Sequence, residues 1–155
     1  MSYASGVGND SVDARLPVAE FAFPGPLRDR LVDAILRGDK VSTTSLAAQY
    51  DLGEPMPEPG QRFAVVDSVG RRAAVIEVTN VAIVSLGAVD LAHCVDEGEG
   101  YTSVEAWREA HEAFWRGEEV RTELGERAGA LDEATPVVLE HFKLVGRLEG
   151  RPVRT

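Results

Sequence analysis

One short segment of the chain concentrates side chains that could do chemistry. Lys40 follows Gly38, a glycine that ends a predicted helix, and four hydroxyl residues stand in a row from Ser42 to Ser45. A lysine in this position can hold an oxyanion or a phosphate, or act as a base if burial lowers its pKa. A nearby threonine such as Thr43 could then be the nucleophile. The alternative is a solvated loop whose hydroxyls cap turns, and the glycine–lysine spacing is not that of a P-loop.

A second segment, from Asp96 to Tyr101, alternates acidic residues with glycines. The glycines permit tight turns of the backbone, so that a carboxylate can point inward. Glu97 or Glu99 could in that case act as a general acid or base. The alternative is an acidic surface loop that leads into a helix capped by Ser103, where carboxylates are favoured by the helix dipole. The pattern leaves both interpretations open.

A third candidate is an aromatic stripe on that helix. Trp107, His111, Phe114 and Trp115 recur at helical spacing and share one face. An aromatic face beside a histidine could stack on a nucleobase. The alternative is that the stripe belongs to the hydrophobic core and that the histidine is hydrogen-bonded and inert.

The elements that position these groups follow from hydrophobic periodicity and from helix and turn signals. The spacing predicts a helix over Leu27–Arg37, with Pro26 at its first position and Gly38 at its end. A second helix is predicted from Ser103 to about Gly117, and 118–129 is a candidate for a third. Residues 54–60 are a loop because three prolines fall within five residues. Strands are predicted over Arg62–Asp67, Arg72–Thr79, Val81–Leu86 and Pro136–Gly146.

The order helix, strands, helices, closing strand predicts an α+β fold. We expect a small, partly closed antiparallel β-barrel flanked by helices, since short turns join the strands. The expected domain covers 19–147, after a flexible N-terminal arm over 1–18 and before a tail over 148–155.

Composition and charge exclude several classes of protein. The 155 residues suffice for one domain and contain no apolar run that could cross a membrane. Residues 1–20 lack the pattern of a secretory signal, and the single cysteine, Cys94, cannot form an internal disulfide. We therefore expect a cytoplasmic protein with no membrane partner, metal ion or cofactor.

The charge is strongly asymmetric along the chain. From Asp96 to Glu133 there are 12 acidic and 4 basic residues, which gives this stretch −8 of the net −10. Proteins that grip a long nucleic acid usually present a basic face. A small nucleoside or nucleotide is therefore easier to reconcile with this charge than a long polyanion.

Taken together, two motifs resemble the ASCH domain, a branch of the PUA-like superfamily. The first, Gly38-x-Lys40-x-x-Thr43, is similar to the GxKxxT signature of that domain. The resemblance extends from about Phe21 to Val145. The second motif resembles the "EGEG…S…W…H…F" run of the larger bacterial members and comprises Glu97-Gly98-Glu99-Gly100, Ser103, Trp107, His111 and Phe114.

This resemblance implies a β-barrel with a cleft that takes a nucleoside, a nucleotide or a short RNA. Some short ASCH members hydrolyse N4-acylated cytidines with a threonine, a lysine and a glutamate, and some larger members have been linked to RNA cleavage. Carried over, Thr43 would be the nucleophile, Lys40 its base and Glu99 the acidic partner, with Glu97 as the alternative. The residues expected to bind the ligand are Gly38, Ser42, Ser45, Glu97, Ser103, Trp107 and His111.

The long acidic helical insert and the proline-rich loop distinguish this chain from the short members. Two other functions therefore stay open: a non-catalytic RNA-binding module, and a ribonuclease that uses the same cleft.

Overall fold

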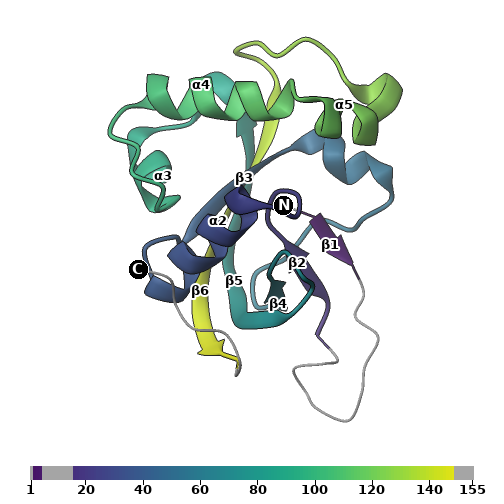
Figure 1. Ribbon diagram of the computed structural model, residues 1–155. Coiled ribbons are helices and arrows are strands. Elements are labelled where there is room, and N and C mark those ends of the chain that lie inside the picture. Colours follow the sequence, from purple (N-terminus) through teal and green to yellow (C-terminus); the bar gives the residue numbers. More distant parts are fainter. Residues whose placement is uncertain (1, 5–15, 149–155) are drawn as a thin grey trace.

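The computed structural model describes residues 2–4 and 16–148, which form a six-stranded mixed sheet with helices packed against it (Figure 1). The strands lie in the order β1-β2-β4-β5-β6-β3, and all neighbours are antiparallel except the parallel pair β2 and β4. Their bounds are β1 Ser2–Ala4, β2 Val18–Glu20, β3 Ser42–Leu46, β4 Arg62–Val66, β5 Arg72–Ser85 and β6 Pro136–Arg147.

The sheet is open, because β1 and β3 are its two edges and do not pair with each other. The predicted α+β class is confirmed, but the sheet is not closed into a barrel. The sheet is also not purely antiparallel, because the short strand β2 pairs with β4 in parallel at Val18 and Ala19. The predicted N-terminal arm thus contains β1 and the start of β2, while 5–15 and most of the predicted tail, 149–155, lie outside the described residues.

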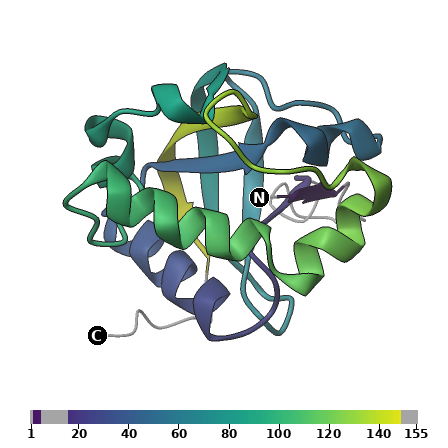
Figure 2. The same ribbon diagram turned by 90° about the horizontal axis from the view of Figure 1, so that it is seen from above.

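The described residues form four α-helices beside the sheet, and Figure 2 shows α2 and α4 next to each other on one side of it. Short 3-10 helices at Ala47–Leu52, Leu86–Ala88 and Gly125–Arg127 complete the connections. Among the described residues, no helix combines the length and the apolar character needed to cross a membrane. The helix bounds are α2 Pro26–Arg37, α3 Leu91–Asp96, α4 Val104–Trp115 and α5 Glu118–Leu124.

The two long helices begin and end where local signals predict. Pro26 stands in the first turn of α2, and Gly38 ends this helix with a left-handed φ of 82°. The Oγ atom of Ser103 accepts a hydrogen bond of 3.1 Å from the amide of Ala106 and so caps α4.

The structure differs from the predicted elements in three further places. The predicted strands over 72–79 and 81–86 are one continuous strand, β5, with a shift of register between Val78 and Asn80. The hydroxyl-rich segment from Ser42 to Leu46 is not a solvated loop but the fully buried edge strand β3, paired with β6. Helix α3 lies in a segment for which no element was predicted.

Two hydrophobic clusters divide the core. One lies between the sheet and α2 and includes Val32, Ile35 and Phe142. The other lies between the sheet, α4 and α5 and includes Trp107 and Leu124. The polar groups described below lie where these clusters meet.

Candidate functional site

Lys40 is a charged residue held almost entirely inside the protein, with only 1% of its side chain exposed. Its Nζ atom donates to the carbonyl oxygens of Ser42, at 2.9 Å, and of Glu97, at 3.2 Å. Two carboxylate oxygens are also near: Glu97 Oε1 at 3.7 Å and Glu99 Oε2 at 3.6 Å. All four neighbours are acceptors, so in this geometry Nζ is a donor.

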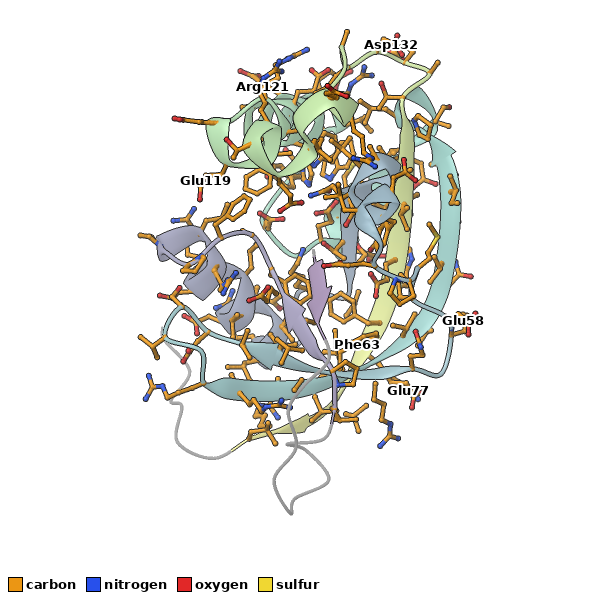
Figure 3. The ribbon with its side chains drawn as sticks, turned by 90° about the vertical axis from the view of Figure 1, so that its right-hand side faces the viewer. Glu58, Phe63, Glu77, Glu119, Arg121 and Asp132 are labelled. Atoms are coloured by element: carbon orange, nitrogen blue, oxygen red, sulfur yellow. The ribbon has the colours of Figure 1, made fainter. Side chains whose placement is uncertain are left out.

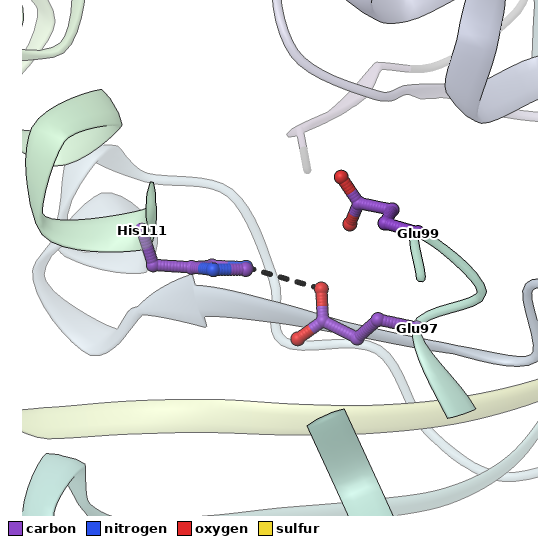
Figure 4. A group of neighbouring side chains, drawn as sticks. All are labelled: Glu97, Glu99 and His111. Atoms are coloured by element: carbon purple, nitrogen blue, oxygen red, sulfur yellow. Dashed lines mark hydrogen bonds and ion pairs between the residues drawn. The ribbon is translucent and has the colours of Figure 1, made fainter. Parts of the chain in front are cut away.

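Glu97 is the acceptor around which the buried donors are arranged. Its Oε2 atom accepts from the Thr44 hydroxyl at 2.9 Å and from the indole Nε1 of Trp107. Its Oε1 atom lies 3.1 Å from Nε2 of His111, the contact drawn in Figure 4. On the Oε2 side, Nε2 of His93 stands 3.4 Å away. The surroundings satisfy a buried carboxylate on both of its oxygens, as burial of a charge requires.

The two glutamates have opposite pKa shifts although both are partly or fully removed from solvent. Burial by itself would raise the pKa of Glu97, but Lys40 and the hydrogen bonds from His111 and His93 hold it well below its usual range. Burial raises the pKa of Glu99, and the charge of Glu97 adds to this shift while Lys40 only partly opposes it. Glu97 is therefore a fixed anion, whereas Glu99 is suited to take up and release a proton.

A cavity of about 590 Å³ opens above this cluster, between α2, β3 and α4. Its volume lies within the range usual for sites that bind small molecules. Glu99 is the more exposed of the two glutamates, with 20% of its side chain accessible, and Figure 4 shows its carboxylate beside that of Glu97 on the same turn. The wall includes the aromatic residues Phe21, Tyr101, His111, Phe114 and Trp115 and the polar residues Arg30, Arg37, Lys40, Thr43, Thr44, Gln49, Glu97 and Glu99.

Backbone contacts bring the two sequence motifs together at this cavity. The amide of Val41 donates a 2.8 Å hydrogen bond to the carbonyl oxygen of Asp96. The turn that carries both glutamates is thereby fastened to the segment between α2 and β3.

Of the predicted site residues, five line the cavity: Lys40, Thr43, Glu97, Glu99 and His111. The remaining five are not part of its wall and act as supports. Gly38 ends α2, Ser103 caps α4, and Ser45 is buried within β3. Ser42 donates to the carbonyl oxygen of His93 at 3.2 Å, and Trp107 is fully buried with its indole bonded to Glu97.

Three contributors were missed by reasoning from the sequence: Thr44, His93 and Tyr101. Thr44 was overlooked because a run of hydroxyl residues also fits a loop. Had a strand been predicted, the alternation of its side chains would have given Thr43 and Thr44 different surroundings. His93 precedes Glu97 by four residues, a spacing that would have paired them had a helix been expected there. Burial raises the pKa of the Tyr101 phenol to about 12, which keeps it a neutral hydroxyl at the cavity wall.

Glu97, Glu99 and His111 also carry oxygen and nitrogen atoms that lie within 4.8 Å of one another, close enough to ligate a metal ion. However, the ammonium of Lys40 already stands within 3.7 Å of both carboxylates. The Lys40 ammonium is therefore the cation that neutralises these carboxylates, and a divalent metal ion would have to displace this ammonium.

Comparisons with known proteins give consistent results. The family model for the ASCH domain matches residues 20–146. The fold resembles the crystal structure of an ASCH domain from Lactobacillus crispatus JV V101, with a TM-score of 0.72, 32% identity and coverage of 83% of this chain and 79% of that one. A protein from Enterococcus faecalis V583 shares the fold with a TM-score of 0.70 at 23% identity, over 83% of this chain and 75% of that one. No curated protein matches the chain.

Proposed function

The chain belongs to the ASCH domain family, and from this premise we propose that its cavity binds a nucleoside-type ligand. One observation carries the proposal: the Lys40–Glu99 pair stands at the wall of a 590 Å³ cavity that also presents several aromatic side chains. A nucleobase offers flat apolar faces and an edge of alternating donors and acceptors. Aromatic walls suit the faces, and a carboxyl group beside an ammonium suits the edge.

We further propose that the cavity hydrolyses an acyl amide carried by the base. The Thr43 hydroxyl attacks the acyl carbon, and the Glu99 carboxylate takes up the proton that Thr43 loses. Glu99 then returns this proton to the departing amine nitrogen, and water releases the acyl group from Thr43 in a second step. Both residues belong to the cavity wall, and the raised pKa of Glu99 suits a group that takes up a proton and then returns it during the reaction.

In this mechanism Lys40 has a different role from the base expected from the family motif. Its Nζ atom faces four oxygen acceptors and directs no lone pair at Thr43. We propose that Lys40 positions Glu99 and offers positive charge to the oxyanion that forms at the acyl carbon.

The experiment has a binding arm and a turnover arm. Calorimetric titration with cytidine tests binding, and chromatographic detection of cytidine released from N4-acetylcytidine tests hydrolysis. We expect Glu99→Gln to lower turnover about 10²- to 10⁴-fold. Thr43→Val should abolish turnover, whereas the isosteric control Thr44→Val, in the same strand, should retain part of it. Undiminished turnover in Thr43→Val and Glu99→Gln would refute the mechanism, and absence of cytidine binding would refute the ligand class.

A second candidate, a non-catalytic RNA-binding module, is favoured by the guanidinium groups of Arg30 and Arg37 in the cavity wall. Phosphate contacts make affinity fall steeply as salt rises, while contacts to an uncharged nucleoside do not. Titration with a short RNA at two salt concentrations, together with the absence of turnover, would identify this function.

A further inference from the structure

A second hollow, of about 330 Å³, adjoins the first beneath the junction of α4 and α5. Trp115 belongs to the walls of both hollows, which are therefore neighbours. The floor of the second hollow is apolar and includes Leu46, Ala47, Leu124 and Leu131.

Arginines gather around this second hollow although the surrounding segment is strongly acidic. Three of the four basic residues between Asp96 and Glu133 belong to its wall: Arg116, Arg121 and Arg127. The wall holds a single acidic residue, Asp51.

Two of these arginines are not neutralised. Within the described part of the chain, no carboxylate stands within ion-pair distance of Arg121 or Arg127, while Arg116 pairs with Glu112 at 3.6 Å. Figure 3 shows Arg121 at the surface of the helical layer. Unpaired guanidinium groups beside an apolar hollow favour a ligand that is partly flat and partly anionic. A phosphate matches the planar guanidinium group, which can bind it through two parallel hydrogen bonds.

We infer that the second hollow is a subsite for the nucleotide that follows or precedes the one in the first cavity. The base or ribose of this nucleotide lies on the apolar floor beside Trp115, and the phosphate that links the two units is bound by Arg121 and Arg127. This inference rests on the proposed function. It defines the ligand further, because a chain of at least two nucleotides would fill both hollows while a free nucleoside fills one.

The test compares cytidine with the dinucleotide CpC by calorimetric titration at low salt. We expect CpC to bind more tightly, and we expect the double variant Arg121→Gln/Arg127→Gln to weaken CpC binding about tenfold or more. The affinity for cytidine should not change, which also shows that the variant is folded. The log–log salt dependence of CpC binding should become shallower by at most about 0.7, because CpC carries a single phosphate.

Arg62→Gln is the matched control. Arg62 is another exposed arginine, paired at 3.0 Å with Glu77, which Figure 3 places at the opposite end of the molecule from Arg121. This control should leave both affinities unchanged.

The outcomes separate this inference from the proposed function. If cytidine binds and CpC binds no tighter, the subsite is wrong and the proposed function stands. A gain for CpC that survives removal of both arginines also overturns the subsite. If neither compound binds, both conclusions fall.

Discussion

Gly98 lies directly against the backbone of Lys40: a Cβ atom on Gly98 would stand 2.5 Å from the Lys40 amide nitrogen and 2.4 Å from the carbonyl oxygen of Asp39. Gly98 also has a left-handed φ of 70°, a conformation that glycine adopts without strain. This approach allows the carbonyl oxygen of Glu97 to reach Nζ of Lys40. The glycine between the two glutamates is therefore what lets the acidic turn close on the lysine.

Gly98→Ala should consequently lower both stability and ligand binding. The new methyl group meets backbone atoms, which cannot rotate away, so we expect the free energy of unfolding to fall by about 2–4 kcal/mol. Gly100→Ala is the matched control, because Gly100 has a φ of 87° but no atom near the position of its Cβ. Urea unfolding of both variants separates backbone strain from the clash. Equal losses in the two variants would show that the contact with Lys40 is unimportant.

The ion pair between Lys40 and Glu97 should make these two residues strongly interdependent. Lys40→Met leaves the Glu97 carboxylate buried without its cation, and such a change costs about 3–5 kcal/mol. In a double-mutant cycle with Glu97→Gln, the combined loss should be smaller than the two single losses added together, by more than about 1 kcal/mol. The measurement is equilibrium unfolding in urea.

The exposed pair Arg62 and Glu77 provides the comparison for this cycle. Arg62→Met and Glu77→Gln should couple much more weakly than the substitutions at Lys40 and Glu97, since surface pairs contribute little. If the losses of unfolding free energy at Lys40 and Glu97 were additive, the two residues would not be coupled, and the ion pair between them would not contribute to stability.

The helices could be predicted from sequence because their signals are local. Pro26 and Gly38 at the two ends of α2, and Ser103 at the start of α4, act within a single turn of the chain. Strand β3 could not be predicted in this way. Its residues are polar, and they are buried only because Thr44 pairs with Leu139, about a hundred residues further along the chain.

The site was predictable as a set of residues but not as an arrangement. The two motifs predicted Lys40, Glu97 and Glu99 as members of one site, and all three line the same cavity. The spacing of the residues does not reveal which glutamate is more exposed to the cavity. That depends on the backbone turns at the glycines and on the hydrogen-bond donors from β3 and α4. Trp107 shows the same limit, since a stripe on a helix does not tell whether an indole meets the ligand or the carboxylate behind it.

The hydrogen bond from Trp107 to Glu97 should be measurable apart from the packing of the ring. Trp107→Phe keeps an aromatic ring in the core but removes the indole donor, and we expect a loss of about 1.5–3 kcal/mol beyond that of packing. Trp115→Phe, at a neighbouring buried position on the same helix, estimates the loss from packing alone. Thermal unfolding of both variants gives the comparison. Equal losses would contradict a stabilising role for the indole N–H.

The pKa shift of Glu99 should give stability a distinctive dependence on pH. Its folded-state pKa is raised above 4.5, so in the window above pH 4.5 the folded chain still holds a proton that the unfolded chain has lost. The free energy of unfolding of the unmodified chain should therefore fall, relative to Glu99→Gln, as pH rises from 4.5 through the raised pKa. Urea unfolding at constant ionic strength across this range measures the difference. Above the window the difference should level off.

Glu97→Gln should change the pH profile in the opposite sense and at lower pH. The pKa of Glu97 in the folded chain lies well below 4.5, so its ionised form stabilises the fold above pH 4.5 and this contribution is lost as pH falls through the folded-state pKa. Relative to Glu97→Gln, the unmodified chain should therefore lose stability on acidification below 4.5. If the stability difference from the unmodified chain changed with pH in the same direction for both variants, Lys40, His93 and His111 would not be giving the two glutamates opposite pKa shifts. Profiles of opposite sign would establish Glu97 as the fixed anion and leave Glu99 as the group free to exchange a proton with a ligand.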